Sequence, residues 1–221
     1  MNHLTVNGSG ADGGSAPLSR TLLAPPARPA EWLADGVRAL APVSVVVAAV
    51  GWGPQAAGVM ALTVPAVLLP RAVAARPWFD ILAVTVILVA AWSNVLGLYE
   101  SVRGWDLVVH AVCTGVLAAL TYLVLARSGV VPAPRRPGVA RRTPIVIVIA
   151  LGLALSALWE ILEWVGTLVA PDIYVTYRDT IGDMAAGGLG AVVAGIVTAT
   201  VRLQRDQERP PRPISPRGPR R

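Results

Sequence analysis

The chain has 221 residues, of which 54% are hydrophobic and 14% charged, and its mean hydropathy is +0.60. This composition is typical of a membrane protein and argues against an ordinary soluble domain. The 19 basic residues are all arginine and the net charge is +6, but the arginines lie in tails and loops beside apolar segments. We therefore expect a lipid bilayer as partner and no nucleic acid.

Both ends of the chain are polar. Residues 1–30 are rich in Gly, Ser, Ala and Pro, which predicts a disordered tail, and they lack the basic segment and early apolar run of a signal peptide. Residues 203–221 are rich in Arg and Pro and predict a disordered cytoplasmic tail that can contact anionic lipid. Residues 31–202 are the expected membrane domain. The single cysteine, Cys113, excludes an intrachain disulfide.

A membrane-spanning helix needs about 20 mainly apolar residues. Four segments meet this requirement plainly: 78–98, 105–125, 144–169 and 180–201. The stretch 39–70 is too long for one span and contains the turn signal Gly51-Trp52-Gly53-Pro54, so it predicts two helices, at about 32–51 and 54–70. The competing interpretation is one tilted helix, which would make five spans.

The arginines favour six spans. With six, each arginine-rich segment falls on the cytoplasmic side, and the other three connections hold only Arg103 and Arg178. With five, the N-terminal arginines would lie outside. The predicted fold is thus an all-α polytopic bundle of six transmembrane helices with both termini inside. The use of arginine alone is typical of high-GC coding, so we expect the plasma (inner) membrane of a bacterium.

Carboxylates are the most informative polar residues. Between residues 81 and 201 they are Glu100, Asp106, Glu160, Glu163, Asp172, Asp179 and Asp183. A carboxylate near hydrocarbon is costly unless it is paired, protonated or metal-bound. The predicted orientation places all of these acids in the outer half of the bundle.

Residues three or four apart share a helix face, and this spacing predicts three polar faces. They are Asp106, His110 and Thr114; Ser156, Glu160 and Glu163; and Asp179, Asp183 and Gly187. The third face continues through Ala191 and Gly195, and a stripe of small residues allows close helix packing inside a bundle. The predicted site therefore consists of Asp106, His110, Glu160, Glu163, Asp179 and Asp183, with Glu100 and Arg178 at its periphery.

Like charges in a low dielectric cannot all remain ionised. Some of these acids must be protonated, paired with Arg103 or Arg178, or bound to a cation. Carboxylates with one imidazole suit a divalent ion such as Mg²⁺, Mn²⁺ or Zn²⁺. Alternatively, Asp106 and Asp179 only cap their helices and His110 is a core histidine. Capping does not account for acids inside a helix, such as Glu160 and Asp183.

Three motifs in order resemble the YjdF-type family of bacterial inner-membrane proteins over residues 78–200. They are Trp105-Asp106-x3-His110-x4-Gly115, Trp159-Glu160-Ile161-Leu162-Glu163-Trp164 and Asp179-Thr180-x2-Asp183-Met184. That family is a domain of unknown function, so the resemblance implies a multi-span fold and these key residues but no reaction. A remote likeness to VanZ-type membrane proteins rests on Arg178-Asp179-x3-Asp183 and a glycine-rich helix, without the usual glutamine and asparagine.

Three functions are compatible with this pattern. The first is a carrier or sensor that binds a divalent cation or small solute at the carboxylate–histidine site. The second is an intramembrane metal-assisted hydrolase or transferase acting on a lipid-linked substrate, with His110 or a glutamate as general base. The third is a non-catalytic scaffold. The absence of a serine or cysteine nucleophile motif argues against covalent catalysis, and a site near one leaflet argues against transport.

Overall fold

The computed structural model describes residues 18–169 and 176–205, and within that part the protein is helical, with no strand beyond one isolated β-bridge. Six segments are long and apolar enough to cross a membrane, which confirms the predicted six-span bundle. These segments are α2 (Pro29–Trp52), α3 with α4 (Pro54–Ala66 and Leu69–Ala72), α5 (Pro77–Val95), α7 (Trp105–Arg127), α8 (Arg142–Val169) and α9 (Tyr177–Thr200). The short helices α1 (Leu18–Leu23) and α6 (Leu98–Ser101) accompany them.

The turn signal after residue 50 separates two helices. α2 ends at Trp52, Gly53 adopts a φ of 88°, and α3 begins at Pro54. Glycine tolerates this left-handed φ, and proline suits the first position of a helix because its missing N–H needs no partner there. The single tilted helix of the five-span interpretation is therefore not formed.

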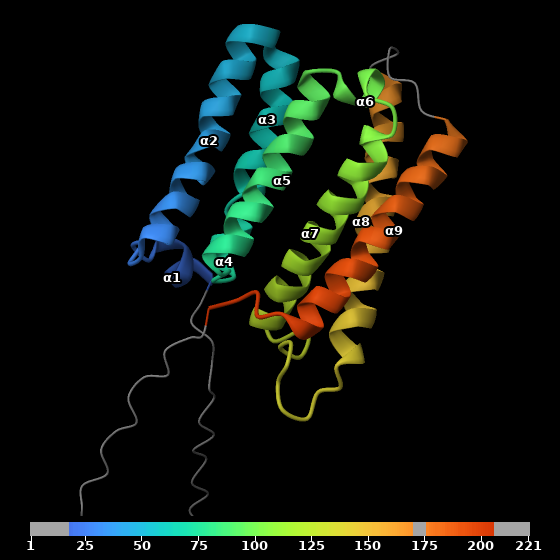
Figure 1. The fold of residues 1–221 in the computed structure, drawn as a ribbon. Coiled ribbons are helices and arrows are strands. Elements are labelled where there is room, and N and C mark those ends of the chain that lie inside the picture. The colour runs from blue at the N-terminus through green and yellow to red at the C-terminus, as the bar shows by residue number, and fades with distance from the viewer. Residues whose placement is uncertain (1–17, 170–175, 206–221) are drawn as a thin grey trace, which may run out of the picture.

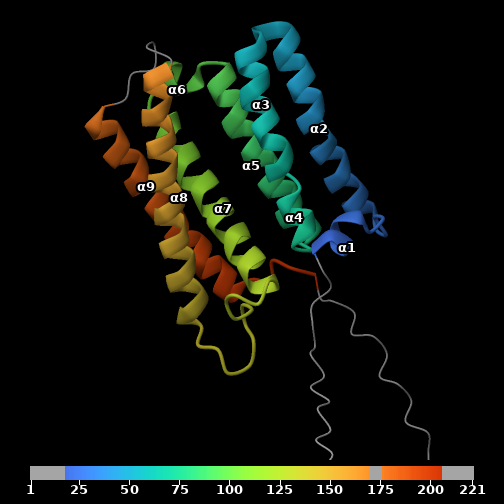
Figure 2. The ribbon, with the colours of Figure 1, turned by 180° about the vertical axis from the view of Figure 1, so that it is seen from behind.

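The spans form two groups of three (Figure 1, Figure 2). α2, α3 and α5 pack on one another, and α7, α8 and α9 pack on one another, with α5 facing α7 where the groups meet. α4, the connection 128–141 and the segment 201–205 lie at one end, which we call the basic end. α6 and the first turns of α7 and α9 lie at the other, which we call the acidic end.

Close backbone contact joins α9 to α7 and α8. A Cβ built on Gly190 would overlap the carbonyl oxygen of Ala111 in α7, and a Cβ on Gly115 would lie 2.7 Å from the carbonyl oxygen of Gly190. A Cβ on Gly152 of α8 would overlap the side chain of Ala191. The small-residue face predicted for the last helix is therefore buried in the bundle, because only small residues permit helices to approach this closely.

At the basic end, a network of ion pairs joins α2 to α5 and to Arg71. The Arg38 guanidinium of α2 donates to both carboxylate oxygens of Asp80 in α5, at 2.6 and 2.8 Å, and both residues are buried. Asp35 pairs with Arg38 and with Arg71. No sequence pattern predicted the pairing of Arg38 with Asp80, because the two residues are far apart along the chain.

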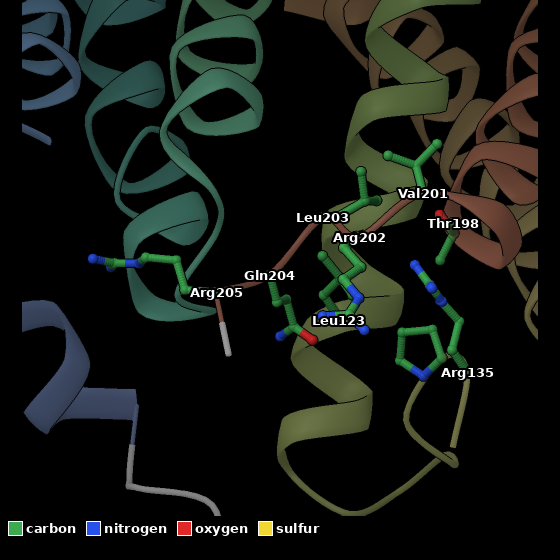
Figure 3. A pocket seen from close by; sticks show the side chains of 9 residues that line it. Leu123, Arg135, Thr198, Val201, Arg202, Leu203, Gln204 and Arg205 are labelled. Carbon is green, nitrogen blue, oxygen red and sulfur yellow. The ribbon is translucent and has the colours of Figure 1, made fainter. Parts of the chain in front are cut away.

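The last described residues cross from one helix group to the other. Ala75 and Gln204 form the isolated bridge, the Arg76 N–H donates to the Leu203 carbonyl at 2.7 Å, and Arg205 pairs with Glu31 of α2 at 2.8 Å. Residues 201–205 line part of a pocket of about 320 Å³, and Figure 3 shows their side chains. We call residues 201–205 the strap, since they tie α9 to the turn between α4 and α5.

Some residues of the two predicted disordered tails have defined structure. Disorder was expected over 1–30 and 203–221, but α1 occupies residues 18–23, and Arg71 donates to the Leu22 carbonyl at 2.9 Å. The strap likewise includes residues 203–205. Composition did not indicate these contacts because they are made with distant helices. Residues 1–17 and 206–221 lie outside the described part of the chain.

The close packing around Gly190 predicts that a single added methyl group lowers the stability of the protein. Gly190→Ala should destabilise the protein by about 1–3 kcal/mol or more, because the new Cβ would meet backbone that cannot move aside. Thermal unfolding in detergent measures the change. Gly58→Ala in α3 is the matched control, since nothing lies within 4 Å of its Cβ position. Equal stability of the two variants would contradict the close approach of α9 to α7.

The Arg38–Asp80 pair predicts a second effect. Asp80→Asn should cost about 3–5 kcal/mol of stability, because the buried Arg38 charge would lose its main partner. Replacing both residues with apolar side chains, Arg38→Met with Asp80→Leu, should recover most of the loss because no unpaired charge then remains. Chemical unfolding of the single and double variants tests this. A double variant no more stable than Asp80→Asn would argue against the pairing.

Candidate functional site

The three predicted polar faces meet near the acidic end, between α7, α8 and α9. His110 lies five residues into α7, Asp183 six residues into α9, and Glu160 nine residues before the end of α8. At about 1.5 Å per residue these positions lie about 8–14 Å from the helix ends, short of the middle of a bilayer core about 30 Å thick. The site is thus inside the membrane-spanning region but displaced toward one surface.

His110 lies between two buried carboxylates. Its Nδ1 is 3.9 Å from Glu160 Oε1, and its Nε2 is 3.7 Å from Asp183 Oδ2. Glu160 is 6% exposed and Asp183 is 3% exposed. One ligand atom from each of the three residues lies within 4.8 Å of the others, so the three could surround a single metal ion. Helices distant in sequence thus bring together an imidazole and two carboxylates.

Several buried polar atoms here form no hydrogen bond with the residues that the structure describes. Both oxygens of Glu160, Oδ1 of Asp183 and Oγ of Ser156 are buried and form no hydrogen bond in the described structure. Buried polar atoms nearly always have a partner, because an unsatisfied one loses its interactions with water. The side chains therefore form an incomplete polar site, which a bound group would complete.

A second group of acids adjoins the first. Asp106, Asp179 and Asp183 also offer ligand atoms within 4.8 Å of one another, so Asp183 belongs to both groups. Asp106 is half-buried and Asp179 is exposed, in contrast to the deeper carboxylates. Five of the six predicted site residues thus lie in two adjoining groups that share one aspartate.

Small and hydroxyl residues form the floor of the site, one helical turn deeper. A Cβ on Gly187 would lie 2.6 Å from Ser156 Oγ and 3.1 Å from Thr114 Oγ1. Glycine at this position therefore leaves space for the two hydroxyls between the helices. Helical spacing predicted these residues on three separate faces, but only the packing shows that they lie against one another.

Glu163 is the predicted site residue that neither group contains. Its Oε1 accepts a hydrogen bond from Trp159 Nε1 at 2.9 Å, one turn earlier on α8. Trp159 also lies edge-on to His110, with ring centroids 6.4 Å apart. Trp159 stands in one of the sequence motifs without a predicted role, and its position next to Glu160 was the available signal.

The peripheral candidates lie apart from the two groups. Glu100 on α6 and Arg178 on α9 are exposed, and in the described part of the chain neither Arg178 nor Arg103 forms an ion pair with the site carboxylates. Pairing with these arginines, one of the expected ways to neutralise the acids, is therefore not observed there. Asp172 lies outside the described residues.

The two acids near helix starts lie in the first turn of their helices, not at the N-cap. α7 has Gly104 at its N-cap, with no side-chain cap bond. At α9 the cap is Thr176, whose hydroxyl accepts from the Asp179 N–H at 3.2 Å. Neither Asp106 nor Asp179 is the N-cap residue. The helix dipole favours an acid in the first turn, and both carboxylates also belong to the group that shares Asp183.

Comparison with known proteins identifies one family. The model of a family described as "Predicted membrane protein (DUF2238)" matches residues 32–204, which include all six spans except the first three residues of α2. This agrees with the resemblance to YjdF-type membrane proteins, whereas no comparison supports the likeness to VanZ-type proteins. No curated protein and no solved structure matches the chain.

Proposed function

We propose that this chain, which belongs to the DUF2238 family of predicted membrane proteins, binds a divalent cation within the membrane. The proposed ligands are His110, Glu160 and Asp183. One observation carries the proposal: two buried carboxylates with unsatisfied oxygens lie on either side of an imidazole. A cation would satisfy these oxygens and offset their charge, which hydrocarbon cannot do.

The distances support a shared ion better than direct hydrogen bonds. The His110 nitrogens are 3.7 and 3.9 Å from the nearest carboxylate oxygens, beyond hydrogen-bonding range. Ligand atoms about 2.0–2.2 Å from one metal lie about 3–3.5 Å from one another. Small changes of side-chain rotamer would therefore suffice to bring the three residues onto an ion.

The donor set limits the identity of the ion. One imidazole and two carboxylates suit Zn²⁺ or Mn²⁺, whereas Ca²⁺ prefers six to eight oxygen ligands. Three protein ligands would leave a coordination position open, as in catalytic rather than structural zinc sites. This supports a second candidate, a metal-assisted hydrolase or transferase acting on a lipid-linked substrate. A non-catalytic scaffold would need none of the three ligands.

We also propose that the protein resides in a bacterial plasma membrane with both termini in the cytoplasm. The basic end contains Arg71, Arg76 and the arginines of the connection 128–141, whereas the loops of the acidic end contain only Arg103. Short loops that are rich in arginine generally remain on the cytoplasmic side of the membrane. The cation site would then open toward the outer face.

Metal analysis tests the proposed ligands. Wild-type protein purified without chelator and incubated with Zn²⁺ or Mn²⁺ should retain the metal, and Asp183→Asn should lower its affinity by roughly tenfold or more, since even second-shell changes around a metal cost 10–100-fold. Elemental analysis after dialysis measures retention. Glu100→Gln, an exposed acid at the same end of the bundle, is the matched control and should bind like wild type.

Two results would overturn the cation site. Wild-type protein that retains no metal under these conditions would exclude it. An Asp183→Asn variant that retains as much metal as wild type would show that the ion binds elsewhere, and unaltered cellular function of Asp183→Asn and Glu160→Gln would favour a scaffold. Circular dichroism of each variant establishes that the helices remain folded.

Cysteine labelling tests the orientation. In a Cys113→Ala background, a membrane-impermeant maleimide should label Ser101→Cys in intact cells, because this exposed residue lies at the acidic end. Ser128→Cys, exposed after α7 at the basic end, should react only after permeabilisation. The reverse pattern would invert the proposed topology.

A further inference from the structure

We propose that the site holds two divalent cations and that the Asp183 carboxylate bridges them. This inference rests on the proposed function and deepens it. The deeper position would use His110 and Glu160 with Asp183, and the shallower position would use Asp106 and Asp179 with Asp183.

The arrangement of the two ligand groups supports a bridge. Each contains three residues with ligand atoms within 4.8 Å of one another, and Asp183 is their shared member. Its Oδ2 faces His110 Nε2 at 3.7 Å, while its buried Oδ1 forms no hydrogen bond in the described structure. A carboxylate can bind one ion through each oxygen, and two-ion sites typically hold their ions about 3.5–4 Å apart.

The charge of the site favours two ions over one. A single divalent ion at the deeper position would be balanced by the carboxylates of Glu160 and Asp183. Asp106 and Asp179 would then remain next to Asp183 with no arginine paired to them among the described residues. Repulsion between carboxylates this close is strong where water is scarce. A second divalent cation would offset it.

The two positions differ in donors and in access to water. The deeper one combines a nitrogen with oxygens from buried residues, which suits Zn²⁺ or Mn²⁺. The shallower one offers only carboxylate oxygens, from a half-buried and an exposed residue together with Asp183. Such a position would keep water ligands and suits Mg²⁺ or Mn²⁺. The shallower ion should therefore bind more weakly and dissociate first.

Manganese is the probe that separates one ion from two. Titration of wild-type protein with Mn²⁺ should saturate at two ions per chain. Low-temperature electron paramagnetic resonance should show spin coupling between two nearby ions, beyond the six-line signal of isolated Mn²⁺. Asp179→Asn and Asp106→Asn should each reduce the stoichiometry to one and abolish the coupling, while Asp183→Asn should weaken both positions.

The controls separate this inference from the proposed function. Glu100→Gln, an exposed acid at the same end of the bundle, should retain two coupled ions, which excludes adventitious binding to surface acids. One ion in wild type, unchanged in Asp179→Asn, would overturn the second position and leave the single-ion site intact. Two ions without spin coupling would overturn the bridge. No bound Mn²⁺ in wild type would overturn the two-ion site, and retention of Zn²⁺ by the same protein would leave the single-ion site intact.

Discussion

The close approach of α9 to α7 and α8 is the constraint on which the site depends. Gly190 lies against the Ala111 backbone, and Gly152 lies against Ala191, at distances that leave no space for a larger side chain. Because this packing extends along α9 as far as Gly187, the carboxylate of Asp183 one turn earlier is brought against the imidazole of His110. With larger residues at these positions, the polar side chains would lie too far apart to share a ligand.

The acidic residues at the two ends of the molecule differ in their partners. At the basic end, Glu31, Asp35 and Asp80 each pair with an arginine, and these pairs connect α2 with α5, with Arg71 and with the strap. At the acidic end, the described structure pairs no arginine with Glu160 or Asp183. A buried ion pair can be purely structural, but two buried acids that face one imidazole and no arginine in the described structure require another explanation. This contrast is the reason to regard the acidic end as functional.

Much of the candidate site could be predicted because helical periodicity is a local property. The spacing of Asp106, His110, Glu160 and Asp183 placed each residue on its helix face, and those faces do meet. Glu163 shows the limit of this reasoning. It lies one turn from Glu160, but its carboxylate accepts from Trp159. Spacing shows which residues can share a face, whereas the direction of a side chain depends on the partners within its reach.

The sequence by itself determined the membrane class, the six spans and the break between α2 and α3, because apolar length and the Gly53-Pro54 turn act over adjacent residues. Only the tertiary structure decided that Arg38 pairs with Asp80, that the strap pairs with the α4–α5 turn, and that Asp183 belongs to two ligand groups. Each of these contacts joins residues far apart in the chain. These contacts form only when helix packing fixes the rotation and the depth of each span. No pattern of neighbouring residues determines that rotation or depth.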